Sequence, residues 1–217
     1  GLGLETIDKS NSLQTLAHYD ALTGLPNEAL LIGRLQQALS RAHHNQRTVA
    51  VVVVDCPELT RLVDIRGRHV GDRLRKQLAD YLTAALREGD TVARTGQDEF
   101  TLVLADMAQS GDMVQLSERL LRGPTVPVDE GAMRLALPLR GGAALYPSDA
   151  DTAENLIQYA ALTLHTAATA PGSCMFYSAS LNALTRSQLR LEYELQHAIE
   201  RDELSLVYQL VADTETR

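Results

Sequence analysis

Apolar residues recur along this chain at spacings that predict helices and strands in succession. Residues 48–55 form a nearly unbroken run of valine and alanine, which predicts a strand buried on both faces. Helical spacing of apolar residues predicts a helix over 27–39, whose first residue is an asparagine N-cap. Two further helices are predicted over 59–65 and 70–86, with a break at Gly67.

Two short apolar runs, residues 90–94 and 100–104, flank a polar stretch of Thr, Gly, Gln, Asp and Glu. This pattern predicts a β-hairpin that carries two carboxylates at its tip, Asp98 and Glu99. Such a tip can hold a metal ion beside a phosphate group.

The second half of the chain continues the alternation of helices and strands. An amphipathic helix is predicted over 109–122, a strand over 135–146 with interruptions at Pro138 and a Gly-Gly pair, and a helix over 153–168. A short strand is predicted over 175–177. This order predicts an α/β fold, with a central sheet and helices packed on its faces.

The two ends of the chain have a different character from the middle. Residues 1–19 carry apolar residues at helical intervals, which predicts the end of a connecting helix from an upstream module, with a frayed terminus as the alternative. Residues 189–199 predict a helix, and residues 203–211 predict a strand.

Composition limits the class of protein. With 217 residues, 45% of them hydrophobic, the chain can bury one core, so one domain with flanking segments is expected. No apolar run reaches the ~20 residues that cross a bilayer, and no signal peptide is recognised, although a longer parent protein could carry membrane segments upstream.

A net charge of -8 argues against a nucleic-acid surface. Two distant cysteines, Cys56 and Cys174, predict a reducing cytoplasmic location without a disulfide or zinc site.

The hairpin tip gives the chain a family resemblance. Residues 96–100 read Gly-Gln-Asp-Glu-Phe, residues 20–27 read Asp-Ala-Leu-Thr-Gly-Leu-Pro-Asn, and Asp55 ends the valine-rich run. Together they resemble the GGDEF family of diguanylate cyclases, with Gln97 in place of the second glycine. The resemblance implies an α+β sandwich of the nucleotide-cyclase type, with a central mixed sheet flanked by helices. It also implies a dimer that joins two GTP molecules into cyclic di-GMP.

The resemblance assigns roles to the acidic residues of residues 20–180, the expected GGDEF domain. It implies that Mg²⁺ is bound by Asp55, Asp98 and the backbone carbonyl of Cys56, and that Asp98 and Glu99 take part in catalysis. Asp72 is the corresponding guanine-binding residue. The signature itself comprises Gly96, Gln97, Asp98, Glu99 and Phe100.

Several substrate-binding positions depart from the family pattern. The asparagine that reads the guanine edge is Val63 here, and the phosphate-side lysine is Thr60. The lysine and arginine that hold the terminal phosphates correspond to Ala168 and Gly172. Each lost charge-assisted contact removes roughly 1.5–3 kcal/mol of binding. We therefore expect weak GTP binding and a domain that has kept the fold and lost the synthesis.

Another family site matches at its key residues. Arg87 and Asp90 lie upstream of the hairpin at the spacing of the inhibitory Arg-x-x-Asp site, which binds cyclic di-GMP in the family. The alternative is a helix C-terminus, in which Arg87 lies near the negative end of the helix dipole and Gly89 ends the helix.

The last segment resembles a second family. Tyr208 and Gln209 match the first strand of an EAL phosphodiesterase domain, although Leu210 replaces the usual proline. Residues 181–217 are therefore expected to be a linker helix and the first strand of an EAL domain. Three hypotheses follow: a non-catalytic module that dimerises or regulates the EAL domain after an upstream sensor, a weakly active cyclase, and a GTP-binding allosteric module.

Overall fold

The computed structural model describes residues 17–107, 119–128, 133–166 and 171–178. These residues belong to the first of two compact units, residues 1–178. Most of the predicted connecting helix, and the predicted EAL start with Tyr208 and Gln209, lie outside the described residues.

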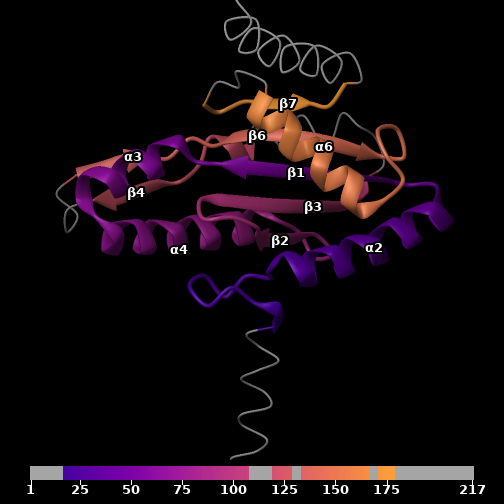
Figure 1. The fold of residues 1–217 in the computed structure, drawn as a ribbon, viewed down its shortest axis with the longest axis horizontal. Coiled ribbons are helices and arrows are strands. Elements are labelled where there is room, and N and C mark those ends of the chain that lie inside the picture. The colour runs from indigo at the N-terminus through magenta and orange to yellow at the C-terminus, as the bar shows by residue number, and fades with distance from the viewer. Residues whose placement is uncertain (1–16, 108–118, 129–132, 167–170, 179–217) are drawn as a thin grey trace, which may run out of the picture. The chain divides into compact units, whose positions relative to one another are not determined.

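A five-stranded sheet forms the centre of the described domain (Figure 1). Its strand order is β2-β3-β1-β6-β7. The first four strands pair antiparallel, and β7 pairs parallel with β6, so the sheet is mixed as predicted. The strands are β1 (Thr48–Asp55), β2 (Thr91–Arg94), β3 (Glu99–Met107), β6 (Arg140–Tyr146) and β7 (Cys174–Phe176).

The valines of β1 explain why this strand lies in the middle of the sheet. Val52 and Val54 belong to the core on one face, which β1 shares with α3 (Pro57–Arg66) and α4 (Arg68–Ala85). The alternate residues Val51 and Val53 belong to the core on the other face, against α2 (Glu28–Asn45) and α6 (Ala153–Thr166). Successive side chains of a strand point to opposite faces, so a strand without a polar side has to be covered on both. The predicted three-layer arrangement is confirmed.

The predicted N-cap of α2 and the predicted break between α3 and α4 are confirmed, whereas α2 continues to Asn45, six residues beyond the predicted range. The Asn27 side chain accepts a hydrogen bond from Leu30 N at 3.1 Å and caps α2. The break between α3 and α4 falls at Gly67, whose φ of 83° favours glycine. Three leucines spaced by four residues on α4 are fully buried: Leu74, Leu78 and Leu82.

The strand predicted over 135–146 is two strands in different sheets, which separate at the predicted interruption at Pro138. β5 (Met133–Ala136) ends before Pro138 and pairs with β4 (Thr125–Val128), an unpredicted strand, in a separate two-stranded sheet. Between β5 and β6 the chain bonds elsewhere: Leu139 N donates to Leu121 O at 2.8 Å. Pro138 has no N–H to offer a sheet, so the break falls there. The Gly-Gly pair, by contrast, lies within β6 and pairs with β1.

Two other predicted elements are described only in part. The last turn of the helix predicted over 109–122 is helical at residues 119–121, and the chain turns at Gly123 with φ 67°. The helix predicted over 153–168 is observed to residue 166, and its last two residues lie outside the described part. Among the described residues, no helix is both long and apolar enough to span a bilayer.

Candidate functional site

The signature residues lie at the turn between β2 and β3, as the sequence predicts: Gly96, Gln97 and Asp98 are in the turn, and Glu99 and Phe100 begin β3. The amides of Thr95 and Gly96 both donate to Glu99 O, at 3.2 and 3.3 Å, and close the turn. Phe100 is fully buried and anchors the hairpin in the core that it shares with α4. Gln97 is exposed at the tip, where its backbone carbonyl accepts bonds from two arginines.

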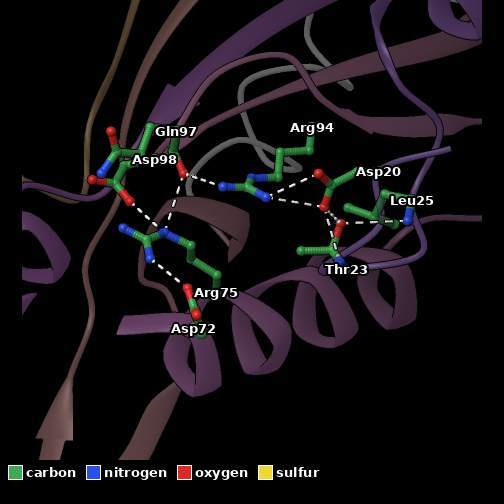
Figure 2. Close-up of polar contacts among 8 residues, drawn as sticks. All are labelled: Asp20, Thr23, Leu25, Asp72, Arg75, Arg94, Gln97 and Asp98. Atoms are coloured by element: carbon green, nitrogen blue, oxygen red, sulfur yellow. Dashed lines mark hydrogen bonds and ion pairs between the residues drawn. The ribbon is translucent and has the colours of Figure 1, made fainter. Parts of the chain in front are cut away.

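Arg75 of α4 binds the predicted catalytic carboxylate, Asp98 (Figure 2). Its Nε lies 2.8 Å from Asp98 Oδ1 and 3.2 Å from Gln97 O. Its Nη1 lies 2.9 Å from Oδ1 of Asp72, the predicted guanine-binding residue. The Arg75 side chain is only 4% exposed and that of Asp98 17%, so this ion pair is largely shielded from water, whereas Asp72 reaches Arg75 from a half-exposed position.

Arg140, at the start of β6, binds the other predicted metal ligand. Its Nε donates to Asp55 Oδ1 at 2.9 Å, and its Nη2 donates to Asp55 Oδ2, so both carboxylate oxygens are held. This hydrogen bonding raises the pKa of the Arg140 guanidinium above its usual value. The Cys56 carbonyl, the third predicted ligand, accepts from Leu59 N at 3.1 Å at the start of α3.

Asp55 and Asp98 are held by arginines on different elements. Asp55 lies opposite Glu99 in the β1–β3 ladder, and Glu99 Oε1 lies 3.1 Å from His165 Nε2 of α6. Asp98 is bonded instead to α4 and, through Thr60 Oγ1 at 3.3 Å, to α3. Within the described ranges, no three His, Cys, Asp or Glu residues are grouped to hold a metal ion.

Val63, the predicted departure at the guanine-reading position, packs against α4. A side-chain Cβ at Gly71 would lie 2.4 Å from the Val63 Cγ2 methyl, so the two helices approach closely at this point. Val63 is half-buried against the core on this face. An apolar side chain therefore lines the space beside Asp72, with no donor or acceptor for a base edge.

A second ion pair fixes the base of the hairpin to the segment before α2. Arg94 Nη1 lies 2.9 Å from Asp20 Oδ2, and Arg94 Nη2 donates to Gln97 O at 2.8 Å (Figure 2). Burial raises the pKa of Asp20, but hydrogen bonds from Thr23 and Arg94 outweigh it, and the pKa lies below its usual value. The Gln97 carbonyl thus connects the Asp20 pair to the Arg75 cluster.

These arginines were not predicted from the sequence as partners of the acidic residues. Arg75 was detectable, because Asp72 and Arg75 are three residues apart on a predicted helix and such pairs lie on one face. Arg140 and Asp55 are separated by 85 residues, and only the strand pairing brings them together.

The predicted inhibitory residues do lie side by side. Arg87 Nε lies 3.6 Å from Asp90 Oδ2, and Arg87 Nη2 donates to Ala105 O at 2.6 Å. The Asp90 side chain is 2% exposed and accepts from the backbone amides of Arg87 and Ala105, and its burial raises its pKa. Arg87 itself is exposed and lines a cavity of about 330 Å³ between α2 and β3, with Arg41, Asn45 and Asp106.

Comparison with known proteins identifies the family. The family model "Diguanylate cyclase, GGDEF domain" matches residues 17–173. The chain is 34% identical over 201 residues to the bifunctional diguanylate cyclase/cyclic di-GMP phosphodiesterase MucR of Pseudomonas aeruginosa, covering 92% of this chain and 29% of MucR. It is also 34% identical over 163 residues to the diguanylate cyclase TpbB of the same organism, covering 74% of this chain and 37% of TpbB.

The solved structures agree with this assignment. The GGDEF domain of TpbB from Pseudomonas aeruginosa superposes with a TM-score of 0.73 at 31% identity, covering 78% of this chain and 99% of that structure. The predicted fold, a mixed central sheet flanked by helices in the nucleotide-cyclase arrangement, is confirmed. The chain belongs to the GGDEF domain family of cyclic di-GMP signalling proteins.

Proposed function

We propose that this chain is a catalytically degenerate GGDEF domain, followed by the start of an EAL domain, and that it regulates the EAL domain instead of making cyclic di-GMP. The observation that carries the proposal is the position of Arg75, which forms ion pairs with both Asp72 and Asp98 from within the chain. In an active cyclase these carboxylates have to be free for guanine and for metal-bound triphosphate. Val63 beside Asp72 supports the same conclusion.

The proposal of an EAL domain rests on how far the match to a relative extends beyond the GGDEF domain. The match to MucR covers 201 residues, which extends well past residue 173, where the family model ends. MucR is named as both a cyclase and a phosphodiesterase. A C-terminal segment shared with such a protein supports a tandem arrangement, in which the GGDEF domain passes a signal from an upstream sensor or forms a homodimer.

Synthesis of cyclic di-GMP from Mg²⁺ and GTP tests the proposal directly. We expect no cyclic di-GMP by liquid chromatography and mass spectrometry over hours, because the retained Asp55, Asp98 and Glu99 are engaged in internal contacts. The diguanylate cyclase TpbB is the positive control. Product formation above the buffer blank would instead establish the alternative of a weakly active cyclase.

A regulatory role in nucleotide sensing is a second candidate, which the exposed Arg87 beside a cavity of about 330 Å³ favours. Its test is a calorimetric titration of cyclic di-GMP into the chain and into an Arg87→Ala variant, with Arg134→Ala as the matched surface control. Binding that only Arg87→Ala abolishes supports a sensor. A GTP titration in the same cell tests the GTP-binding allosteric alternative, for which we expect no heat.

A further inference from the structure

Three charged side chains lie abreast across the sheet at the end of β1. Asp55 is the paired neighbour of Arg140 on β6 and of Glu99 on β3. Residues directly opposite one another in antiparallel strands project from the same face of the sheet. The Arg140 guanidinium donates to both oxygens of Asp55. Such bidentate arginine–carboxylate pairs are among the strongest ion pairs in proteins.

A second arginine, Arg75, binds the hairpin tip itself. The buried Arg75 bonds to Asp98 and Asp72, and also to the backbone carbonyl of Gln97. Together the two guanidinium groups supply two positive charges, which is the charge of one divalent cation. Unlike a metal ion, they are covalently part of the chain and always charged.

These residues do not fit a bound Mg²⁺. Magnesium requires oxygen ligands at about 2.0–2.1 Å in near-octahedral geometry. Both Asp55 oxygens are held by Arg140, the Asp98 oxygens are held by Arg75 and Thr60, and the Cys56 carbonyl accepts from Leu59 N. A metal would have to displace these partners, and a guanidinium would then lie unpaired beside a divalent cation.

We propose that Arg140 and Arg75 are built-in cations that replace the divalent metal of this site. Arg75 holds the hairpin tip against α4, and Arg140 holds Asp55 at the end of β1 to β6. Both arginines exclude metal from the carboxylates that they bind. Arg140 is the direct block, because it occupies the carboxylate at the end of β1. This inference builds on the proposed loss of synthesis and names a residue that causes it.

Binding of Mn²⁺ alone, measured by the loss of the free-ion electron paramagnetic resonance signal, tests the inference on the full chain. We expect the unaltered chain to bind no Mn²⁺ at the carboxylate cluster. Arg140→Ser frees the Asp55 oxygens and is expected to bind Mn²⁺ at least about tenfold more tightly than the unaltered chain. Arg134→Ser, which removes an arginine of β5 that donates to Thr125 O and makes no contact with the carboxylate cluster among the described residues, is the matched control and should gain nothing.

Two more variants test whether the Mn²⁺ gained by Arg140→Ser is bound by Asp55. Arg140→Lys keeps the positive charge, so it should still exclude Mn²⁺. Adding Asp55→Asn to Arg140→Ser should remove the gained binding, because the freed ligand is then neutral. Arg140→Gln replaces Arg140→Ser if circular dichroism shows that the serine variant is unfolded.

Thermal unfolding gives an independent readout. The melting temperature of the unaltered chain should be the same in EDTA and in excess Mg²⁺, whereas excess Mg²⁺ should raise that of folded Arg140→Ser. Tight Mn²⁺ binding by the unaltered chain, or folded neutral variants that gain none, would overturn the inference. If the unaltered chain binds Mn²⁺ yet makes no cyclic di-GMP, the inference fails and the proposed function stands. If it excludes Mn²⁺ and still makes cyclic di-GMP, the proposed function fails.

Discussion

At the scale of single residues, the Asp20–Arg94 ion pair predicts a pH-dependent stability. Asp20→Asn removes the charged partner of Arg94, whose side chain is only 13% exposed, so we expect a loss of about 1–3 kcal/mol in the free energy of unfolding at pH 7. The pKa of Asp20 is lowered in the folded state, so its contribution is present above the usual value of 3.8 and is lost as the pH falls through the lowered pKa. Urea unfolding of both proteins at pH 7 and pH 3 measures this. A stability difference that does not shrink at pH 3 contradicts the assignment.

The burial of the two cysteine thiols predicts that they react slowly with alkylating reagents. Burial raises the pKa of Cys56 to about 11 and that of Cys174 to about 12, so neither forms much thiolate at neutral pH. Iodoacetamide at pH 8 should alkylate both slowly in the folded chain and rapidly in urea, as mass spectrometry of the intact protein would record. Rapid labelling of Cys56 in the native protein would contradict its burial.

At the scale of elements, the contact between β6 and α6 depends on Gly142. A Cβ at this position would lie 2.3 Å from both Ala160 O and Leu164 N, which are backbone atoms of α6 and cannot rotate away. We expect Gly142→Ala to lower the free energy of unfolding by about 1–3 kcal/mol or more, because α6 has to move off the sheet. Gly33→Ala on α2 is the control: no atom lies within 4 Å of its added Cβ, and alanine should stabilise the helix by about 0.5–1 kcal/mol. Thermal unfolding measures both variants, and equal effects would contradict the packing.

Local sequence patterns predicted an element correctly where one feature, such as a run of valines or a helix cap, determined it. The valine run gave β1, the asparagine cap gave the start of α2, and Gly67 gave the break between α3 and α4. Prediction failed over residues 135–146, because two strands belonging to different sheets follow each other with only three residues between them. A local pattern reports that residues favour a strand, but the identity of its partner depends on the rest of the chain.

At the scale of the whole molecule, the division at Ser178 predicts an independent folding unit. A chain that ends at residue 178 should unfold cooperatively, with a melting temperature within a few degrees of the full chain, because the two cores described here are contained in residues 17–178. Calorimetric or circular-dichroism melting of both chains measures this. A truncated chain that is unfolded would contradict an independent folding unit that ends at Ser178.

The sequence by itself determined the family, the order of most elements and the acidic residues of the hairpin tip, because motifs and periodicity are local properties. It also identified Val63 as a departure from the family pattern. Only the tertiary structure decided which side chains the acidic residues bond to. The pairing of β1 with β6 brings Arg140 to Asp55, and the packing of α4 under the hairpin brings Arg75 to Asp98. Ion pairs form between charges that are close in space, and closeness across 85 residues is set by strand register rather than by sequence spacing.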